Sequence, residues 1–241
     1  MRIFLAGASG AIGRRLTPLL LAAGHTVVGT TRSAEKATEL QARGVEPVVV
    51  DVFDADSLLE FVAWARPDVI IHQLTDLPQS FDPARLQDAL VRNSRLRVEG
   101  TANLVAAALA VGAQRLIAQS IAFSYAPGRE PHVESDPLTS GEGNEPGAVS
   151  AHGVHALERA VLGAQGIEGI VLRYGRLYGP GTWNTPNARA PLHVDAAAHA
   201  ALLALTRGTP GVYNIAEDDG AVSIEKARKA LGFDPAFRLA D

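Results

Sequence analysis

Cysteine is absent from this chain of 241 residues. Its absence excludes disulfide bonds, thiolate metal sites and cysteine nucleophiles in one step. A protein without disulfides suits a reducing compartment, and we expect it to be cytoplasmic. The 7 histidines show no ligand spacing such as H-E-x-x-H, so the sequence predicts no metal site.

Long apolar runs and an excess of basic residues are missing as well. No uninterrupted apolar stretch reaches the roughly 18 residues that a membrane span needs. Residues 1–6 run directly into a glycine-rich segment, whereas a signal peptide needs a longer apolar stretch and a cleavage site. The formal net charge of -4 offers no basic field to nucleic acid or to an anionic membrane. We therefore expect a soluble protein that binds neither.

Hydrophobic residues make up 47% of the chain, enough for a substantial core. Strand-like and helix-like segments alternate from the first residue onward. The strands are expected at residues 2–6, 25–30, 47–50, 68–74, 115–119, 167–172 and 212–215. The helices are expected at residues 11–23, 34–43, 55–65, 83–111, 150–165, 194–207 and 223–231. Repeated strand–helix–strand units predict an α/β fold, a doubly wound parallel sheet of about seven strands flanked by helices.

Two stretches interrupt this alternation. They are rich in proline and glycine and show no periodicity. Long loops in a compact domain are usually functional. We expect small substrate-covering elements within residues 126–149 and 176–193, and a surface loop without function is the alternative for the first.

A glycine-rich segment lies between the first expected strand and the first expected helix. Its spacing is G-x-x-G-x-x-G. A pyrophosphate needs bare backbone N–H groups and the positive end of a helix dipole, which side chains would block. We therefore predict one Rossmann-type dinucleotide-binding domain over residues 1–241. Its cofactor contacts are expected from Gly7, Ser9, Gly10, Ala11, Ile12 and Gly13.

The residues after the second expected strand indicate which dinucleotide is bound. An NAD site usually offers a carboxylate to the ribose hydroxyls about 20 residues after the glycines. This chain has Thr31, Arg32 and Ser33 there. Arg32 can donate two hydrogen bonds to a 2′-phosphate, and the hydroxyls of Thr31 and Ser33 can add further hydrogen bonds. A solvated surface arginine is the alternative, and we predict NADP(H) in preference to NAD(H).

The glycine spacing resembles the short-chain dehydrogenase/reductase superfamily in its extended or atypical branches. Further segments resemble its NAD-dependent epimerase/dehydratase-like group, and these are residues 68–75, 100–104, 172–181 and 193–197. The resemblance places Asp51 and Val52 at the adenine. It also places Leu74 and Thr75 along the cofactor ribose and Tyr174 along the nicotinamide.

Three departures from that group bear on function. Its proton-donating tyrosine and the lysine four residues later align with Ser150 and Val154, so the usual catalytic pair is missing. Arg97 stands where the group has an asparagine. Only about a dozen residues separate Gly181 from His193, where relatives place much of a substrate-binding lobe. We expect that C-terminal lobe to be much reduced.

The end of the fifth expected strand offers substitutes for the missing pair. Ligands bind beyond the carboxyl ends of strands in open α/β sheets, so Ser120 and Tyr125 should reach the nicotinamide. We predict Tyr125 as the proton donor, assisted by Ser120 or a water. In the alternative, Tyr125 caps the strand and Ser120 bonds only to backbone. His152 and His155 are interpreted as helix-surface residues, and His72 as a core residue.

We interpret the chain as an atypical short-chain dehydrogenase/reductase-like, NADP(H)-dependent oxidoreductase acting on a small carbonyl or alcohol substrate. Two alternatives stay open: a non-catalytic NADP(H)-binding redox sensor or regulator, and an epimerase/dehydratase-type sugar-modifying enzyme. No G-x-S-x-G elbow supports a hydrolase. Many relatives dimerise through the helices expected at 83–111 and 150–165, so the resemblance implies a homodimer.

Arg32→Ala tests the predicted phosphate contact. Loss of a charge-assisted hydrogen bond should weaken NADP(H) binding by about tenfold, with little change for NAD(H). Fluorescence titration with NADPH and NADH measures both affinities. Equal weakening of the two would remove the phosphate-binding role.

Overall fold

Seven apolar segments form a parallel sheet in the computed structural model, which describes residues 1–78 and 82–240. The strands are β1 (Arg2–Ala6), β2 (Thr26–Thr31), β3 (Glu46–Val49), β4 (Val69–His72), β5 (Arg115–Ile121), β6 (Glu168–Tyr174) and β9 (Gly211–Ile215). Their order is β3-β2-β1-β4-β5-β6-β9, so the winding direction reverses between β1 and β4. Ligands bind near that reversal, at the carboxyl edge of such sheets.

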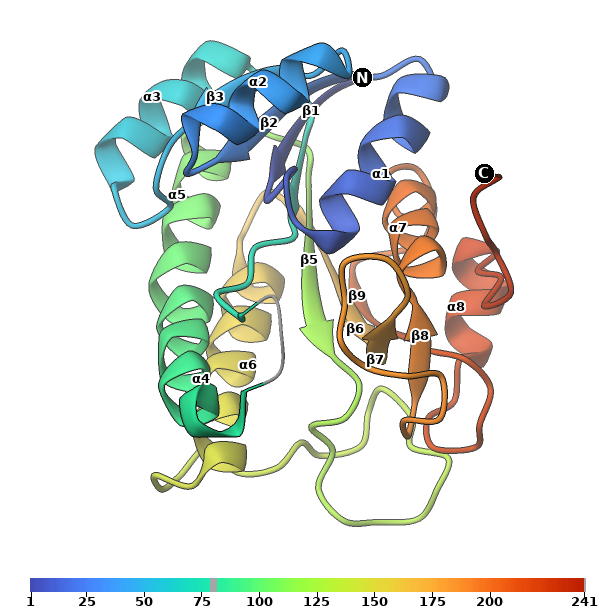
Figure 1. Ribbon diagram of the computed structural model, residues 1–241. Helices are drawn as coiled ribbons and strands as arrows, with labels where there is room; N and C mark the ends of the chain where they lie inside the picture. The colour runs from blue at the N-terminus through green and yellow to red at the C-terminus, as the bar shows by residue number, and fades with distance from the viewer. Residues whose placement is uncertain (79–81, 241) are drawn as a thin grey trace.

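Helices cover both faces of the sheet, as right-handed crossovers require. One face carries α1 (Ala11–Ala22), α2 (Ala34–Ala42) and α7 (Val194–Leu203), with α8 (Glu225–Leu231) beyond them (Figure 1). The other face carries α3 (Ala55–Ala65), α4 (Leu86–Arg95), α5 (Thr101–Val111) and α6 (Pro146–Gly163). This arrangement confirms the predicted doubly wound α/β fold.

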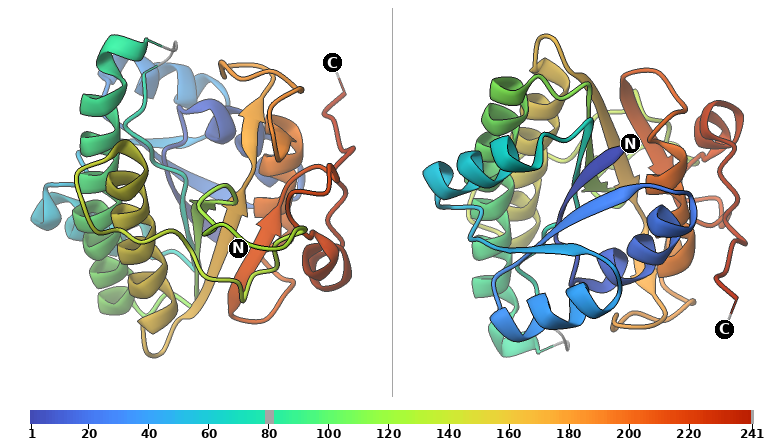
Figure 2. Two further views of the ribbon diagram at one scale, coloured as in Figure 1. Left: turned by 90° about the horizontal axis from the view of Figure 1, so that it is seen from below. Right: turned by 90° about the horizontal axis from the view of Figure 1, so that it is seen from above.

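The alternation of side chains along β1 creates one apolar core on each face. Ile3 and Leu5 join the core beneath α1 and α7, whereas Phe4 and Ala6 join the core beneath α3, α5 and α6. Successive strand residues point to opposite faces, so a strand that is buried on both sides is apolar over most of its length. The two helical layers on either side of the sheet are seen end-on in Figure 2.

Several helices differ from their predicted bounds. The stretch expected at residues 83–111 is divided into a 3-10 turn (Pro83–Arg85), α4, a π-helical segment η2 (Leu96–Gly100) and α5. Helix α6 begins at Pro146 rather than at residue 150, because proline lacks only an N–H that has no helical partner at the first position.

A second, two-stranded sheet was not predicted. Strands β7 (Arg176–Tyr178) and β8 (Pro191–His193) pair in parallel and are joined by the loop 179–190. Three-residue strands carry too little periodicity to be recognised in a sequence. This small sheet and its loop stand beside the carboxyl end of β6 (Figure 1).

The loop 126–145 crosses the carboxyl edge of the sheet, at the lower edge of Figure 1. Its backbone is attached to the segment before α8: the His132 N–H donates to the Ala221 carbonyl at 3.0 Å, and the Ser223 N–H donates to the His132 carbonyl at 2.8 Å. The loop is therefore held against the residues that follow β9. Its predicted role in covering a substrate stays a prediction.

Gly169→Ala tests how closely α6 packs on β6. A Cβ at Gly169 would lie 2.3 Å from the Val161 carbonyl oxygen, so the helix must shift, and we expect a loss of about 1–3 kcal/mol in the free energy of unfolding. Urea denaturation measures it. The control is Gly163→Ala, where no atom lies within 4 Å of the added Cβ, and alanine should be neutral or slightly stabilising. A neutral Gly169→Ala would contradict the packing.

Candidate cofactor and active site

The backbone leaves no room for a side chain at Gly7, in the loop between β1 and α1, or at Gly13, in the first turn of α1. Gly7 has a φ of +94°, and a Cβ there would lie 2.9 Å from the Gln73 carbonyl oxygen. A Cβ at Gly13 would lie 2.2 Å from the Gly7 carbonyl oxygen. Gly10 is the N-cap of α1, so the positive end of the helix dipole faces this loop. Such a cradle fits the pyrophosphate of a dinucleotide.

The other predicted residues of the cradle contribute in different ways. The Ser9 hydroxyl donates to the Thr31 hydroxyl at 3.3 Å and so joins the loop to the end of β2. Ile12 has its side chain in the core and offers only backbone to a ligand. A Cβ on Gly181 would lie 3.5 Å from that of Ala11. The loop 179–190 therefore passes beside the start of α1.

Arg32 and Ser33 follow β2 at the same edge. The Ser33 hydroxyl accepts the Lys36 N–H and caps α2. The Arg32 side chain is 60% exposed, and its guanidinium lies 3.5 Å from the Asp76 carboxylate. Arg92 of α4 approaches the same carboxylate at 3.5 Å. Two guanidinium groups thus meet at one partly buried acid, an arrangement that the sequence did not reveal.

Asp51 and Val52 follow β3, and they differ in exposure. Asp51 is exposed, and one of its carboxylate oxygens accepts the Phe53 N–H at 3.0 Å. Val52 is buried, and its carbonyl accepts the Asn103 side-chain amide at 2.9 Å. Asp51 is therefore the one of the two whose side chain a ligand can reach.

Gln73, Leu74 and Thr75 follow β4. The Gln73 amide donates to the Tyr174 hydroxyl at 3.2 Å, and both side chains are buried. The Gln119 amide donates to the Leu74 carbonyl at 2.9 Å, which joins the ends of β4 and β5. Thr75 is exposed beyond them. Burial raises the pKa of the Tyr174 hydroxyl far above its ordinary value, so it stays protonated at neutral pH.

A buried ion pair joins the ends of β5, β6 and α6. Arg173 donates to both carboxylate oxygens of Glu158, at 2.9 and 2.7 Å. The Ser120 hydroxyl donates to the same carboxylate at 2.7 Å. Arg173 also donates to the Tyr125 hydroxyl at 2.8 Å, and that hydroxyl donates to Asn214 at 2.7 Å. The hydroxyls of both predicted catalytic residues are thus engaged by protein groups.

The surroundings of Tyr125 are those of a packed residue. Its ring stacks on His132 with a centroid separation of 4.9 Å. Burial raises the pKa of the Tyr125 hydroxyl, although the charge of Arg173 opposes that shift. Its proton is directed to Asn214 rather than to an open cleft. The proton-donor role of Tyr125 stays a prediction.

Helix α6 presents neither a tyrosine nor a lysine to the sheet. Val154 is fully buried, and the Ser150 hydroxyl accepts a hydrogen bond from Arg97 at 3.3 Å. Arg97 lies on the π-helical segment η2 and is itself buried. Desolvation lowers its pKa to about 10, and the charge of Glu158 opposes that shift.

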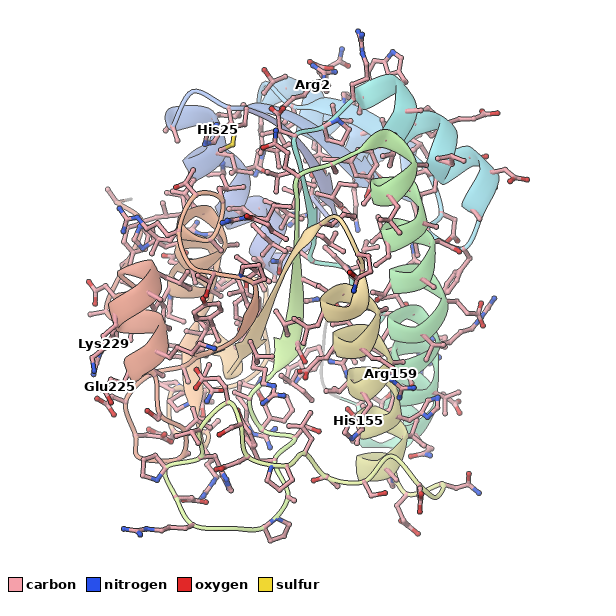
Figure 3. All side chains as sticks on the ribbon, turned by 180° about the vertical axis from the view of Figure 1, so that it is seen from behind. Arg2, His25, His155, Arg159, Glu225 and Lys229 are labelled. Carbon is pink, nitrogen blue, oxygen red and sulfur yellow. The ribbon has the colours of Figure 1, made fainter. Side chains whose placement is uncertain are left out.

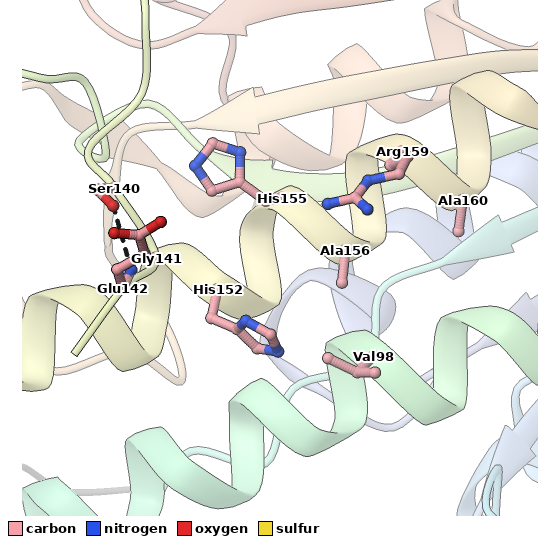
Figure 4. A pocket seen from close by; sticks show the side chains of 9 residues that line it. All are labelled: Val98, Ser140, Gly141, Glu142, His152, His155, Ala156, Arg159 and Ala160. Atoms are coloured by element: carbon pink, nitrogen blue, oxygen red, sulfur yellow. Dashed lines mark hydrogen bonds between the residues drawn. The ribbon is translucent and has the colours of Figure 1, made fainter. Parts of the chain in front are cut away.

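His152 and His155 lie on the outer side of α6. They line an open hollow of about 590 Å³ between α6, η2 and residues 140–142 (Figure 4). The His155 ring bonds to the Thr139 carbonyl at 2.9 Å, and Arg159 follows one turn later along the helix (Figure 3). Neither histidine is in the buried network around Glu158.

Metal ligands and membrane-crossing helices were sought in the described residues. No group of three or more His, Cys, Asp or Glu side chains within residues 1–78 and 82–240 is arranged to hold a metal ion. In the same residues, no helix has the length and apolar character needed to cross a membrane.

The fold and the glycine cradle define a dinucleotide-binding Rossmann protein. The chain belongs to the NAD-dependent epimerase/dehydratase family, whose model matches residues 3–190. Membership supports a nicotinamide dinucleotide as the cofactor and confirms the resemblance seen in the sequence.

One curated relative matches most of the chain. It is the 3-diazoavenalumate denitrifying reductase of a Streptomyces species, 41% identical over 92% of this chain and 70% of its own length. Among solved structures, the UDP-glucose 4-epimerase of Thermotoga maritima superposes with a TM-score of 0.80 at 18% identity, covering 99% of this chain and 94% of its own. The UDP-glucose 4-epimerase of Thermus thermophilus, in complex with NAD, superposes with a TM-score of 0.74 at 23% identity, covering 98% of this chain and 85% of its own. These two structures establish the fold alone.

Several charged residues of the site were missed by sequence reasoning. Asp76, Arg92, Glu158 and Arg173 take part in the ion pairs described above. Glu158 and Arg173 are buried, and a charged residue inside a helix or strand is a signal of pairing when the segment is otherwise apolar. The partner of each depends on the tertiary fold.

The pH dependence of stability should carry the signature of His72. Its ring is buried against Thr101, and desolvation, together with the charge of Arg97, lowers its pKa to about 3. Below the unfolded pKa of about 6.5, the unfolded chain binds a proton that the folded protein excludes. Stability should therefore fall as the pH drops from about 6.5 toward 3, by up to about 1.4 kcal/mol per pH unit from this group.

His72→Asn removes the titrating ring and should flatten that slope, as measured by urea denaturation between about pH 6.5 and pH 4.5. His152→Asn is the matched control, because an exposed ring is solvated in both states and its removal should leave the slope unchanged. An unchanged slope in His72→Asn would mean that the folded protein accepts a proton there.

Proposed function

We propose that the chain is an NADP(H)-dependent reductase of small electrophilic acceptors. The observation that carries the proposal is the composition of α6, where Ser150 and Val154 replace the family's tyrosine and lysine. A substrate reduced here must not require that pair. The reductase that is 41% identical over 92% of the chain supports a reduction rather than an epimerisation.

The residues of the cradle fit the cofactor. Gly7, Gly10 and Gly13 would shape the loop that holds its pyrophosphate: Gly7 and Gly13 permit the tight turn and the close approach of α1, and Gly10 lies at the N-terminus of α1. A reduced nicotinamide supplies a hydride when it is bound. Arg32, which follows β2, and Arg92 share the single Asp76 carboxylate, so the group keeps a net positive charge, which supports a 2′-phosphate and hence NADP(H).

The covering elements support a small substrate. Between β7 and β8 the chain has only the loop 179–190, and the β7–β8 sheet has three residues in each strand. A sugar nucleotide needs contacts for a second nucleotide and a sugar ring. The reduced lobe therefore favours a compact acceptor over a sugar nucleotide.

The proton demand of the reaction narrows the acceptor class. A reduced carbonyl becomes an alkoxide that needs a proton from a well-placed acid. A diazo acceptor has no such demand, since a diazonium group R–N2+ that gains a hydride and loses N2 becomes R–H without an oxyanion. The relative named as a denitrifying reductase of a diazo compound supports this class.

The chain's own contribution is then orientation and exclusion of water. The Glu158–Arg173 pair fixes the ends of β5, β6 and α6 beneath the site, with side-chain exposures of 9% and 5%. Buried, fully paired charges hold their neighbours in one geometry. A cationic acceptor would react next to this ion pair, with the loops 126–145 and 179–190 beside it.

Turnover on an acceptor panel tests the proposal. Purified protein is titrated with NADPH and NADH, then assayed on a benzenediazonium carboxylate, a benzaldehyde and a cyclic ketone against protein-free controls. We expect tighter NADPH binding and NADPH-dependent release of N2 from the diazonium. Tight NADPH binding with no turnover would favour a sensor, and turnover of carbonyls alone would replace the proposed acceptor class.

Tyr125→Phe separates a positioning role from a proton-donating one. Loss of the hydroxyl leaves Asn214 and Arg173 each short of a partner, so we expect a loss of about 1–3 kcal/mol in the free energy of unfolding. Turnover of the diazo acceptor should persist. The control is Tyr178→Phe, whose hydroxyl bonds Glu217 in a partly exposed site and should matter less. Abolished turnover in a stable Tyr125→Phe protein would establish Tyr125 as the donor.

A further inference from the structure

Arg97 is a buried cation with few partners. Its exposed fraction is 7%. A guanidinium has five N–H donors. Among residues 1–78 and 82–240, Arg97 makes one side-chain hydrogen bond, to the Ser150 hydroxyl at 3.3 Å. No carboxylate in those residues lies within 4.0 Å of its guanidinium. Buried charges are otherwise paired in proteins.

The nearest buried carboxylate is committed elsewhere. Both oxygens of Glu158 accept from Arg173, and one also accepts from Ser120. Glu158 therefore attracts Arg97 through space without a hydrogen bond. By contrast, Arg173 has the bidentate pairing that a buried arginine normally requires. The two buried arginines of this region are thus unequal, and Arg97 retains unused donors.

Arg97 lies near the carboxyl edge of the sheet. Its charge acts on His72, the last residue of β4, and its guanidinium contacts Ser150 in the first turns of α6. Gly153 lets the helices meet there, since a Cβ on it would lie 3.2 Å from the Arg97 Cβ. Arg97 also belongs to a π-helical segment, a distortion that is frequent at functional sites.

We propose that Arg97, together with the Ser150 hydroxyl, binds an anionic oxygen of the substrate, such as a carboxylate. This assignment rests on the proposed reductase function and specifies that its substrate carries an anionic group in addition to the group that is reduced. A planar guanidinium offers two parallel N–H groups to a carboxylate, and a neighbouring hydroxyl adds a third donor. The anion supplies the counter-charge that the folded chain leaves out.

A cofactor hydroxyl is the other oxygen acceptor in such a site. A ribose hydroxyl accepts a hydrogen bond but carries no charge, so it leaves the buried cation uncompensated. The charge therefore favours a substrate anion over the cofactor. The two sources predict different effects of the same substitution.

Calorimetric titration with benzoate, in the presence of saturating NADP+, tests the site directly. Arg97→Gln should weaken benzoate binding by about tenfold or more, and Ser150→Ala should weaken it by a smaller factor. NADP+ affinity should change by less than about twofold in both variants. The matched control is Arg159→Gln, an exposed arginine on the outer side of α6, which should leave both affinities unchanged.

Circular dichroism and thermal melting establish that each variant is folded, and Ser150→Ala provides the milder test if Arg97→Gln is unstable. Unchanged benzoate affinity in both folded variants overturns the proposal, as does a wild-type protein that binds no benzoate. Loss of NADP+ affinity with unchanged benzoate affinity assigns the guanidinium to the cofactor instead. Because binding is measured without turnover, failure of the reductase assay leaves this result independent.

Discussion

The close approach of α1 to β1 is the constraint on which the site depends. The Gly13 position brings the helix so near the first strand that any side chain would overlap the Gly7 carbonyl. This contact directs the positive end of α1 at the carboxyl edge of the sheet. The carboxyl ends of β2, β4 and β5 lie at this same edge, because all strands of a parallel sheet end on one side.

At that edge, charge is organised around two buried arginines. On α6, Ser150 and Val154 stand where the family has a tyrosine and a lysine, while the buried Glu158–Arg173 pair and the buried Arg97 lie nearby. The Glu158–Arg173 pair is fully hydrogen-bonded and holds β6 and α6 in a fixed geometry. Arg97 is incompletely paired, and we propose that it attracts an anion. Under that proposal the residues of the site contribute orientation and charge compensation rather than proton donation.

Local patterns were sufficient where a side chain's role follows from its own segment. The seven strands were found because their segments are mostly short apolar runs, as expected for strands that are buried on both faces. The short strands β7 and β8 and the π-helical segment η2 were not, since each depends on contacts with distant residues. Tyr125 shows the same limit: its place beyond the end of the fifth strand was evident, but its bond to Asn214 was not.

The sequence by itself therefore determined the α/β class, the order of elements, the glycine cradle and the missing catalytic pair. These properties reside in periodicity, turn residues and residue identity, which act over a few neighbours. Only the tertiary structure decided which polar groups meet: Asp76 with Arg32 and Arg92, Glu158 with Arg173, and Arg97 with Ser150. Partners separated by dozens of residues are chosen by the packing of whole helices on the sheet, and that packing depends on the whole chain at once.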